Sequence, residues 1–236
     1  MKIVITMAGE GIRFKKAGFS DPKPLIKYRG RSLLEWAIGS LDDFFDDEFI
    51  LLCRDDVGIL DSIPRILDCI GIEDYRVIAL NEPTRGQADT AMKAKSFINK
   101  NDEIMIFNTD THVNPGIMKR EDIHGNGWIP VFKAVGDKWS FVRVANGSMK
   151  AEEVSEKIRI SDLCSIGLYY FDTFSIFEES YHATYGIGLK EKSRTEQYIA
   201  PMYNYMIQSG KCVCAFPIMP NEGVKILGTP EDLVDL

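Results

Sequence analysis

The sequence predicts a single α/β domain built on a doubly wound, mostly parallel sheet. In the first half of the 236-residue chain, short apolar runs of strand length alternate with segments of helical period. This β-α-β-α-β-α-β order predicts parallel strands joined by helices that cover both faces of the sheet. Glycine-rich or polar segments follow the ends of several strands, which is where ligands collect in such sheets.

Each element of the first half has a local signal of its own. Ser32 and Glu35 have the capping-box spacing that satisfies free N–H groups at a helix start, so a helix is expected to begin there. The apolar runs that flank this segment are short enough to be buried strands. Strands are expected at 3–5, 49–53, 76–80 and 103–107, and helices at 32–45, 57–70 and 86–98.

The second half changes to a strand-rich pattern. Asn146-Gly147 follows the strand expected at 140–145 and is a strong hairpin signal. Pro230 predicts the start of a short terminal helix, since proline suits the first helical position. No repeat, low-complexity segment or linker divides the chain, which favours one domain over residues 1–236. Strands are expected at 128–134, 140–145, 165–171 and 211–218, and a helix at 196–208.

Composition limits the class of protein. Apolar residues make up 45% of the chain and charged residues 27%, a balance typical of globular proteins. The net charge of −7 argues against broad binding of nucleic acids or anionic membranes. No apolar run approaches the roughly 20 residues of a membrane span, and a strand starts directly after Met1-Lys2, so no signal peptide is expected. The five cysteines lack zinc-ligand clustering, which favours buried thiols and a cytoplasmic location.

The first apolar run ends in a glycine-rich turn that carries cations. Gly9, Gly11 and Arg13 follow one another at every second position, and Lys23 lies between two prolines that restrict its backbone. Glycines let backbone N–H groups approach phosphate oxygens, and the cations neutralise phosphate charge. Phe14 replaces the third small residue of the dinucleotide fingerprint, and the P-loop pattern is absent. A nucleoside triphosphate site is expected; an ordinary strand-to-helix turn is the alternative.

The turn at 7–13 and the Pro-Lys-Pro-Leu segment at 22–25 together resemble the sugar-1-phosphate nucleotidylyltransferases. The chain is most similar to short capsule-polysaccharide members that lack a C-terminal β-helix, and the resemblance runs from Met1 to Leu233. It implies a Rossmann-like, GT-A-like nucleotidyltransferase fold. It also implies an Mg²⁺-dependent enzyme that couples an NTP to a phosphorylated acceptor and releases pyrophosphate. A nucleotide-binding half at about 1–115 and an acceptor-binding half at about 116–236 follow from the same resemblance.

The resemblance also implies which residues act. Arg13 would contact the triphosphate, and Lys23 would lie beside the reacting phosphate. Asp110, at the end of an expected strand, would bind Mg²⁺, which prefers carboxylate oxygen. These three form the implied catalytic set, although a strand-end aspartate can equally cap a turn. The implied nucleotide-binding residues are Ala8, Gly9, Gly11, Gly86 and Gln87, and the implied acceptor-binding residues are Lys157, Gly167 and Glu196.

The sequence departs from the family pattern at two positions. Ile12 stands where a serine or threonine is usual, so one hydroxyl contact to the phosphates is missing. Ile226 stands where many relatives place a second metal-binding aspartate, two residues before Gly-Thr-Pro-Glu-Asp. Either Asp110 alone holds the metal with the phosphates, or another acid such as Glu222 approaches.

The expected reaction is in-line attack of an acceptor phosphate oxygen on the α-phosphorus of the NTP. A phosphate monoester is already an anionic nucleophile, so the lack of a Ser-His or Cys-His pair is no obstacle. A sugar 1-phosphate for capsule or surface polysaccharide is the expected acceptor, and a small pocket favours CTP, UTP or dTTP. The alternatives are a cytidylyltransferase for phosphocholine-like or phospho-amino-acid acceptors, a GT-A glycosyltransferase, and a non-catalytic nucleotide-binding protein. A homodimer is the default assembly.

Overall fold

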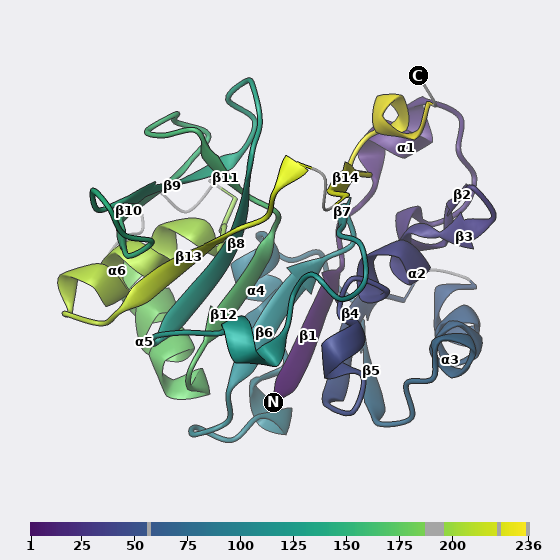
Figure 1. The fold of residues 1–236 in the computed structure, drawn as a ribbon. Coiled ribbons are helices and arrows are strands. Elements are labelled where there is room, and N and C mark those ends of the chain that lie inside the picture. The colour runs from purple at the N-terminus through teal and green to yellow at the C-terminus, as the bar shows by residue number, and fades with distance from the viewer. Residues whose placement is uncertain (56–57, 187–195, 221–222, 235–236) are drawn as a thin grey trace.

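The structure is a computed structural model that describes residues 1–55, 58–186, 196–220 and 223–234 (Figure 1). Within these ranges the main sheet has ten strands in the order β10-β9-β11-β8-β12-β6-β1-β4-β5, with β13 paired to β8. Four strands from the first half, β5, β4, β1 and β6, are parallel neighbours, as the sequence predicts. The strands of the second half continue the same sheet with antiparallel pairs, except that β13 runs parallel to β8.

The strand bounds agree with most expected runs. In the first half the strands are β1 (Lys2–Met7), β4 (Glu48–Arg54), β5 (Tyr75–Leu80) and β6 (Ile104–Asn108). In the second half they are β8 (Gly127–Lys133), β9 (Ser140–Val144), β10 (Ala151–Glu156), β11 (Leu163–Ser165), β12 (Leu168–Phe171) and β13 (Val213–Pro217). Two short ladders join β2 (Lys27–Tyr28) to β3 (Arg31–Ser32) and β7 (Thr111–His112) to β14 (Lys225–Ile226).

Helices cover both faces of the sheet, so its central strands are apolar on both sides. In β1, Val4 packs into one buried cluster, and Ile3 and Ile5 pack into the other. The first cluster includes residues of α4 (Gln87–Met92), α5 (Phe174–Tyr185) and α6 (Tyr203–Gln208). The second includes residues of α2 (Leu33–Ile38) and α3 (Ile59–Ile70). This two-sided burial explains the continuous apolar runs in the sequence.

The capping box at Ser32 is confirmed, but the helix that it starts is shorter than predicted. Glu35 N donates to Ser32 Oγ at 3.2 Å, and Ser32 N donates to Glu35 Oε2 at 2.6 Å. The helix ends at Ile38 because Gly39 follows, and a 3₁₀ turn covers Asp42–Phe44. The segment expected as a helix at 86–98 likewise divides into α4 and a 3₁₀ turn at Lys95–Phe97.

Three predictions in the second half differ from the structure. The single strand expected at 165–171 is broken between β11 and β12 by Gly167, whose φ is +87°. The helix expected at 196–208 begins only with the 3₁₀ turn Ala200–Met202. Helix α5 was not predicted, although Thr173 caps it by accepting from Ile176 N at 3.3 Å. In the ranges that the structure describes, no helix is long and apolar enough to cross a bilayer.

Candidate active site

The glycine turn connects β1 to the short helix α1 (Ile12–Lys16) at the carboxyl edge of the parallel strands (Figure 1). Ala8 is buried, and Gly11 has a φ of +62°, which a side chain rarely adopts. A Cβ on Gly11 would also lie 3.3 Å from Lys23 Cβ. The second glycine therefore lets the turn approach the Pro-Lys-Pro segment closely.

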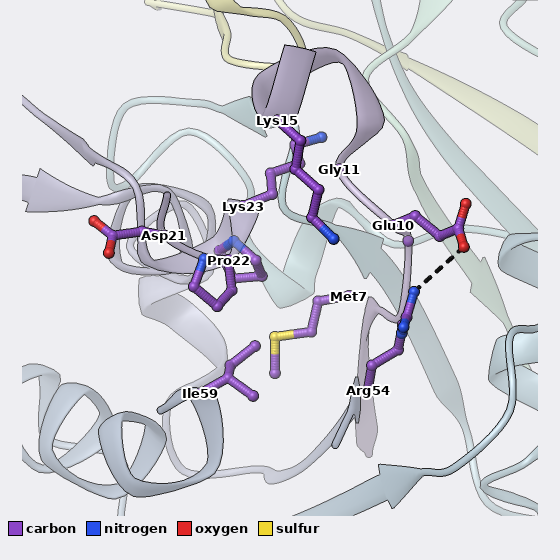
Figure 2. Close-up of a pocket in the computed structure, with 11 residues that line it drawn as sticks. Met7, Glu10, Gly11, Lys15, Asp21, Pro22, Lys23, Arg54 and Ile59 are labelled. Atoms are coloured by element: carbon purple, nitrogen blue, oxygen red, sulfur yellow. Dashed lines mark hydrogen bonds and ion pairs between the residues drawn. The ribbon is translucent and has the colours of Figure 1, made fainter. Parts of the chain in front are cut away.

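A pocket opens beside this turn, and Figure 2 shows the residues around it. Its cations are Lys15, Lys23 and Arg54, and Arg54 Nη1 lies 3.5 Å from Glu10 Oε1. The remaining lining residues come from the end of β1, the glycine turn, the segment before Lys23 and the start of α3: Met7, Gly9, Gly11, Asp21, Pro22, Pro24 and Ile59. The lining therefore holds three positive side chains beside the glycine turn and two carboxylates, Glu10 and Asp21, and this excess of cations suits an anionic ligand such as a polyphosphate.

Arg13 lies outside this lining. It is exposed on α1, and its charge reaches the C-terminal 3₁₀ helix (Pro230–Leu233). There the pKa of Glu231 is lowered, first by its own backbone N–H and the Thr229 hydroxyl, and further by the charge of Arg13. Lys15, two residues later on the same helix, lines the pocket instead. The sequence analysis missed Lys15 because the rotation of α1 about its axis decides which cation enters the pocket.

Lys23 and Asp110 form an ion pair at the edge of the sheet. Lys23 Nζ lies 2.5 Å from Asp110 Oδ1, and it lies 5.7 Å from the ring centroid of the buried Phe14. The side chain of Lys23 is 16% exposed, and that of Asp110 is 42% exposed. The structure thus brings together two residues that are far apart in the sequence, and it leaves the carboxylate open to solvent on one side.

The loop that carries Asp110 is fixed by hydrogen bonds. Asp110 N donates to Asn108 Oδ1 at 3.2 Å, and Leu227 N donates to the Asp110 carbonyl at 2.6 Å. The β7–β14 ladder pairs Ile226 with Thr111, so Ile226 lies next to Asp110 and adds no oxygen ligand there. Glu222 lies outside the described residues.

Asp232 is the other carboxylate beside this loop. A Cβ on Gly228 would lie 3.4 Å from Asp110 Oδ2 and 3.8 Å from Asp232 Oδ2, so Gly228 separates the two acids. Asp232 accepts hydrogen bonds from Thr229 N at 2.8 Å and from Thr229 Oγ1 at 2.9 Å, which caps the C-terminal 3₁₀ helix. Among the described residues, no group of three or more His, Cys, Asp or Glu side chains could hold a metal. Asp232 is thus engaged in a helix cap, whereas the Asp110 carboxylate contacts Lys23.

The segment at Gly86 and Gln87 meets the second half of the chain. Gln87 Nε2 donates to the Gly167 carbonyl at 3.5 Å. A Cβ on Gly167 would lie 2.3 Å from Asn108 Nδ2, so a side chain at that position would displace Asn108. Gln87, Gly167 and Asn108 thus adjoin one another, and Asn108 is two residues from Asp110.

Lys157 and Glu196 are joined through Tyr198. Lys157 Nζ donates to the Tyr198 hydroxyl and lies 4.2 Å from the centroid of the Tyr198 ring, and the hydroxyl donates to Glu196 Oε2. Burial and the neighbouring Glu196 carboxylate hold the pKa of Tyr198 well above its usual value, so its phenol stays protonated. Burial also raises the pKa of Glu156, which lies 3.7 Å from Lys157 Nζ. These side chains form one polar cluster.

Comparison with solved structures shows the family to which the chain belongs. The chain is 33% identical to a nucleoside-diphosphate-sugar pyrophosphorylase from Vibrio cholerae RC9, with a TM-score of 0.89 over 98% of this chain and 97% of that one. The chain belongs to the sugar-1-phosphate nucleotidylyltransferase-like family. It is a nucleotidyltransferase, as its glycine turn and Pro-Lys-Pro segment predict.

More distant structures share the fold of this nucleotidyltransferase. An inositol-1-phosphate CTP transferase from T. maritima is 15% identical, with a TM-score of 0.78 over 99% of this chain and 92% of that one. A UTP-bound UGPase from Acinetobacter baumannii is 18% identical, with a TM-score of 0.73 over 98% and 90% of the two chains. No protein-family model matches the chain, and a search of curated proteins returned no match.

The nucleotidyltransferase also contains polar residues beside its site that the sequence analysis did not identify. Asp89 and Gln197 are 6% and 5% exposed, and both lie within hydrogen-bond distance of the Tyr181 hydroxyl. Tyr181, which both residues contact, is far from each of them in the sequence, so no local pattern indicates that the three lie together. The polarity of Asp89 and Gln197 among apolar neighbours is the one sequence feature that could have suggested that they are buried and hydrogen-bonded.

Proposed function

We propose that this nucleotidyltransferase couples an NTP to a sugar 1-phosphate and releases pyrophosphate, in the synthesis of capsule or surface polysaccharide. The Lys23–Asp110 ion pair carries the proposal, because it stands where the glycine-turn pocket meets the carboxyl edge of β6. Lys23 can neutralise the charge of a reacting phosphate, and Asp110 can hold a divalent cation. The name of the Vibrio cholerae relative supports the substrate class.

The proposed step is an in-line displacement at the α-phosphorus. An acceptor phosphate oxygen forms a bond to this phosphorus, and the bond from phosphorus to the bridging oxygen of the pyrophosphate breaks. The acceptor is already an anion near neutral pH, so the step requires no general base. The enzyme would lower the barrier by holding the two anions together and by neutralising charge with Lys23, with Lys15 and Arg13 toward the triphosphate.

The donor set at the edge of β6 fits Mg²⁺ with one protein carboxylate. Asp110 is partly exposed, whereas Asp232 already caps a helix through two hydrogen bonds. Asp110 would hold the ion, and phosphate oxygens and water would complete its ligands. Bound Mg²⁺ would supply Lewis-acid stabilisation of the phosphate oxygens. Lys23 must then exchange its contact with Asp110 for one with the substrate, because the two cations would repel each other.

The base and the acceptor are assigned to two neighbouring sets of residues. Ala8, Gly9 and Gly11 would lie along the nucleotide, and Gly86 and Gln87 would meet the base, with CTP, UTP or dTTP favoured. The acceptor would bind to Lys157, Gly167 and Glu196, with Lys157, which donates to the Tyr198 hydroxyl, also donating to the acceptor phosphate.

A second candidate acceptor is a phosphorylated alcohol or amine rather than a sugar. Glu156 and Glu196 lie close to Lys157, which suits an acceptor that presents hydrogen-bond donors or a positive charge beyond its phosphate. Sugar hydroxyls satisfy the first description, and phosphocholine-like or phospho-amino-acid compounds satisfy the second. The two acceptor classes are separated by the assay described next.

Pyrophosphate release tests the proposal. Each common NTP is combined with Mg²⁺ and a panel of sugar 1-phosphates, phosphorylated alcohols and phospho-amino acids. We expect pyrophosphate from one pair, and we expect Lys23→Met to lower kcat by roughly a hundredfold or more. Lys27→Met is the matched control, because Lys27 is exposed on β2. NTP binding without pyrophosphate from any pair would contradict the proposal and favour a non-catalytic protein.

A further inference from the structure

The acceptor-side segment 196–198 is hydrogen-bonded directly to the base-side segment 85–89. Gln197 N donates to the Arg85 carbonyl at 2.7 Å, and Ala88 N donates to the Gln197 carbonyl at 3.0 Å. These two bonds bracket Gly86 and Gln87, the residues assigned to the base. A Cβ on Gly86 would lie 2.6 Å from the Gln197 carbonyl oxygen and 2.7 Å from its nitrogen. The two backbones therefore touch, with no room for a side chain between them.

Side chains reinforce this contact from the buried side. The Tyr181 hydroxyl lies 2.9 Å from Gln197 Oε1 and 3.2 Å from Asp89 Oδ1, and it accepts a hydrogen bond from the Arg85 guanidinium at 3.1 Å. Asp89 in turn accepts from Arg85 N at 2.9 Å. One hydroxyl on α5 thus links the end of the base-side segment to the acceptor-side segment. We call the Gln197 backbone bonds and this hydroxyl bridge the Gln197 clamp.

Residues on either side of Gln197 belong to the proposed acceptor site. Glu196 accepts from the Tyr198 hydroxyl, and that hydroxyl accepts from Lys157. A shift of Gln197 would therefore move the acceptor residues and the Gly86–Gln87 backbone together. If binding of the base orders the clamp, it also orders the acceptor residues. Binding of the NTP and binding of the acceptor would then be coupled through this contact.

We infer that Gln197 and Tyr181 are positioning residues that couple binding of the NTP base to binding of the acceptor. This inference rests on the proposed function, because that function assigns Gln87 to the base and Glu196 to the acceptor. Neither Gln197 nor Tyr181 is needed to touch a substrate. Their effect passes through the clamp to the residues that do.

Two tyrosines on α5 provide a matched test. The Tyr181 hydroxyl bridges both segments. The Tyr185 hydroxyl, one turn later, donates to the Tyr198 carbonyl at 2.7 Å, and of these two segments it contacts the acceptor-side one. Tyr181→Phe and Tyr185→Phe each remove one hydroxyl from the same helix. Dissociation constants for CTP, UTP and dTTP with Mg²⁺ are measured by calorimetry, without acceptor, alongside thermal unfolding.

We expect Tyr181→Phe to raise the dissociation constant of the NTP that the wild type binds by roughly three- to tenfold, which is the contribution of one hydrogen bond. Tyr185→Phe should leave that constant within about twofold, because its hydroxyl makes no contact with the base side. Gln197→Leu, which removes the same acceptor oxygen, should repeat the effect if Tyr181→Phe does not fold. In steady-state assays with the active pair, Tyr181→Phe should raise both KM values more than it lowers kcat.

A purely structural role predicts a different pattern. Both tyrosine variants would then unfold at a lower temperature while binding NTP like the wild type, and the inference would be overturned. Equal weakening of NTP binding by the two variants would also overturn it. If the wild type bound no NTP, the proposed function and this inference would both fall. If the wild type released pyrophosphate and Tyr181→Phe matched it in every constant, only the inference would fall.

Discussion

Gly86→Ala is expected to have a large local effect, because it combines an unfavourable backbone conformation with contacts to another backbone segment. Gly86 has a φ of +140°, a backbone conformation that residues with a side chain rarely adopt. The new Cβ would lie 2.6 Å from the oxygen and 2.7 Å from the nitrogen of Gln197, and both of these are backbone atoms. A flexible side chain could move aside, but a backbone held by two hydrogen bonds cannot do so without breaking them.

The magnitude follows from these two contributions. The unfavourable backbone conformation costs about 1–3 kcal/mol. Loss of the bonds from Gln197 N to Arg85 O and from Ala88 N to Gln197 O costs about 1 kcal/mol each. We therefore expect Gly86→Ala to lower the free energy of unfolding by about 3–5 kcal/mol, or to raise the NTP KM by roughly tenfold or more if the segment yields locally.

Gly147→Ala is the matched control. Gly147 also has a positive φ, +74°, but no atom lies within 4 Å of the position that its Cβ would take. Only the conformational cost of about 1 kcal/mol applies there. Urea unfolding gives the free energy of each variant, and steady-state kinetics gives the KM values. Equal unfolding free energies for the two variants, together with a normal NTP KM for Gly86→Ala, would refute this reasoning.

Three other substitutions test separate parts of the site. Asp110→Asn should reduce Mg²⁺-dependent turnover at least roughly a hundredfold without changing the melting temperature; near-normal activity would remove Asp110 from the metal site. Lys157→Ala should raise the acceptor KM far more than the NTP KM, and equal effects on both would contradict its assignment to the acceptor phosphate. The third substitution concerns pH. Burial opposes ionisation of Asp89, but hydrogen bonds from Arg85 and the charge of Lys93 outweigh it and lower the pKa of Asp89 from 3.8. The stabilisation from this carboxylate is therefore complete above pH 3.8 and is lost as the pH falls through its lower folded value. The difference in unfolding free energy between wild type and Asp89→Asn should be largest near neutral pH and should shrink in acid, whereas a constant difference would contradict the assigned cause.

The parallel part of the fold could be predicted because each strand carries its own signal. The run at Ile3–Ile5 is buried on both faces, so it reads as an uninterrupted apolar segment. Parallel order then places the glycine turn and Asp110 at one edge, and the structure joins Lys23 to Asp110 there. The prediction needed only local pattern and a general rule of α/β topology.

Contacts between distant segments could not be predicted in this way. The strand breaks at Gly167, where Asn108 approaches closely. The predicted helix starts only after Gln197, whose backbone is hydrogen-bonded to Arg85 and Ala88. No residue near Gly167 or Gln197 in the sequence indicates which distant segment each of them contacts. The same applies to Lys15, whose place in the pocket depends on how α1 is rotated after Gly11. The roles assigned to Arg13, Lys157 and Glu196 stay predictions.

The fate of the α-phosphate tests the proposed reaction most directly. The enzyme is supplied with Mg²⁺, its active acceptor, and NTP labelled with ³²P at either the α or the γ position. We expect the α label to appear in a nucleoside monophosphate joined to the acceptor phosphate, and the γ label to appear in pyrophosphate. Lys23→Met should suppress both products together. Transfer of the γ label to the acceptor, or release of the α label only as free nucleotide, would contradict nucleotidyl transfer at this site.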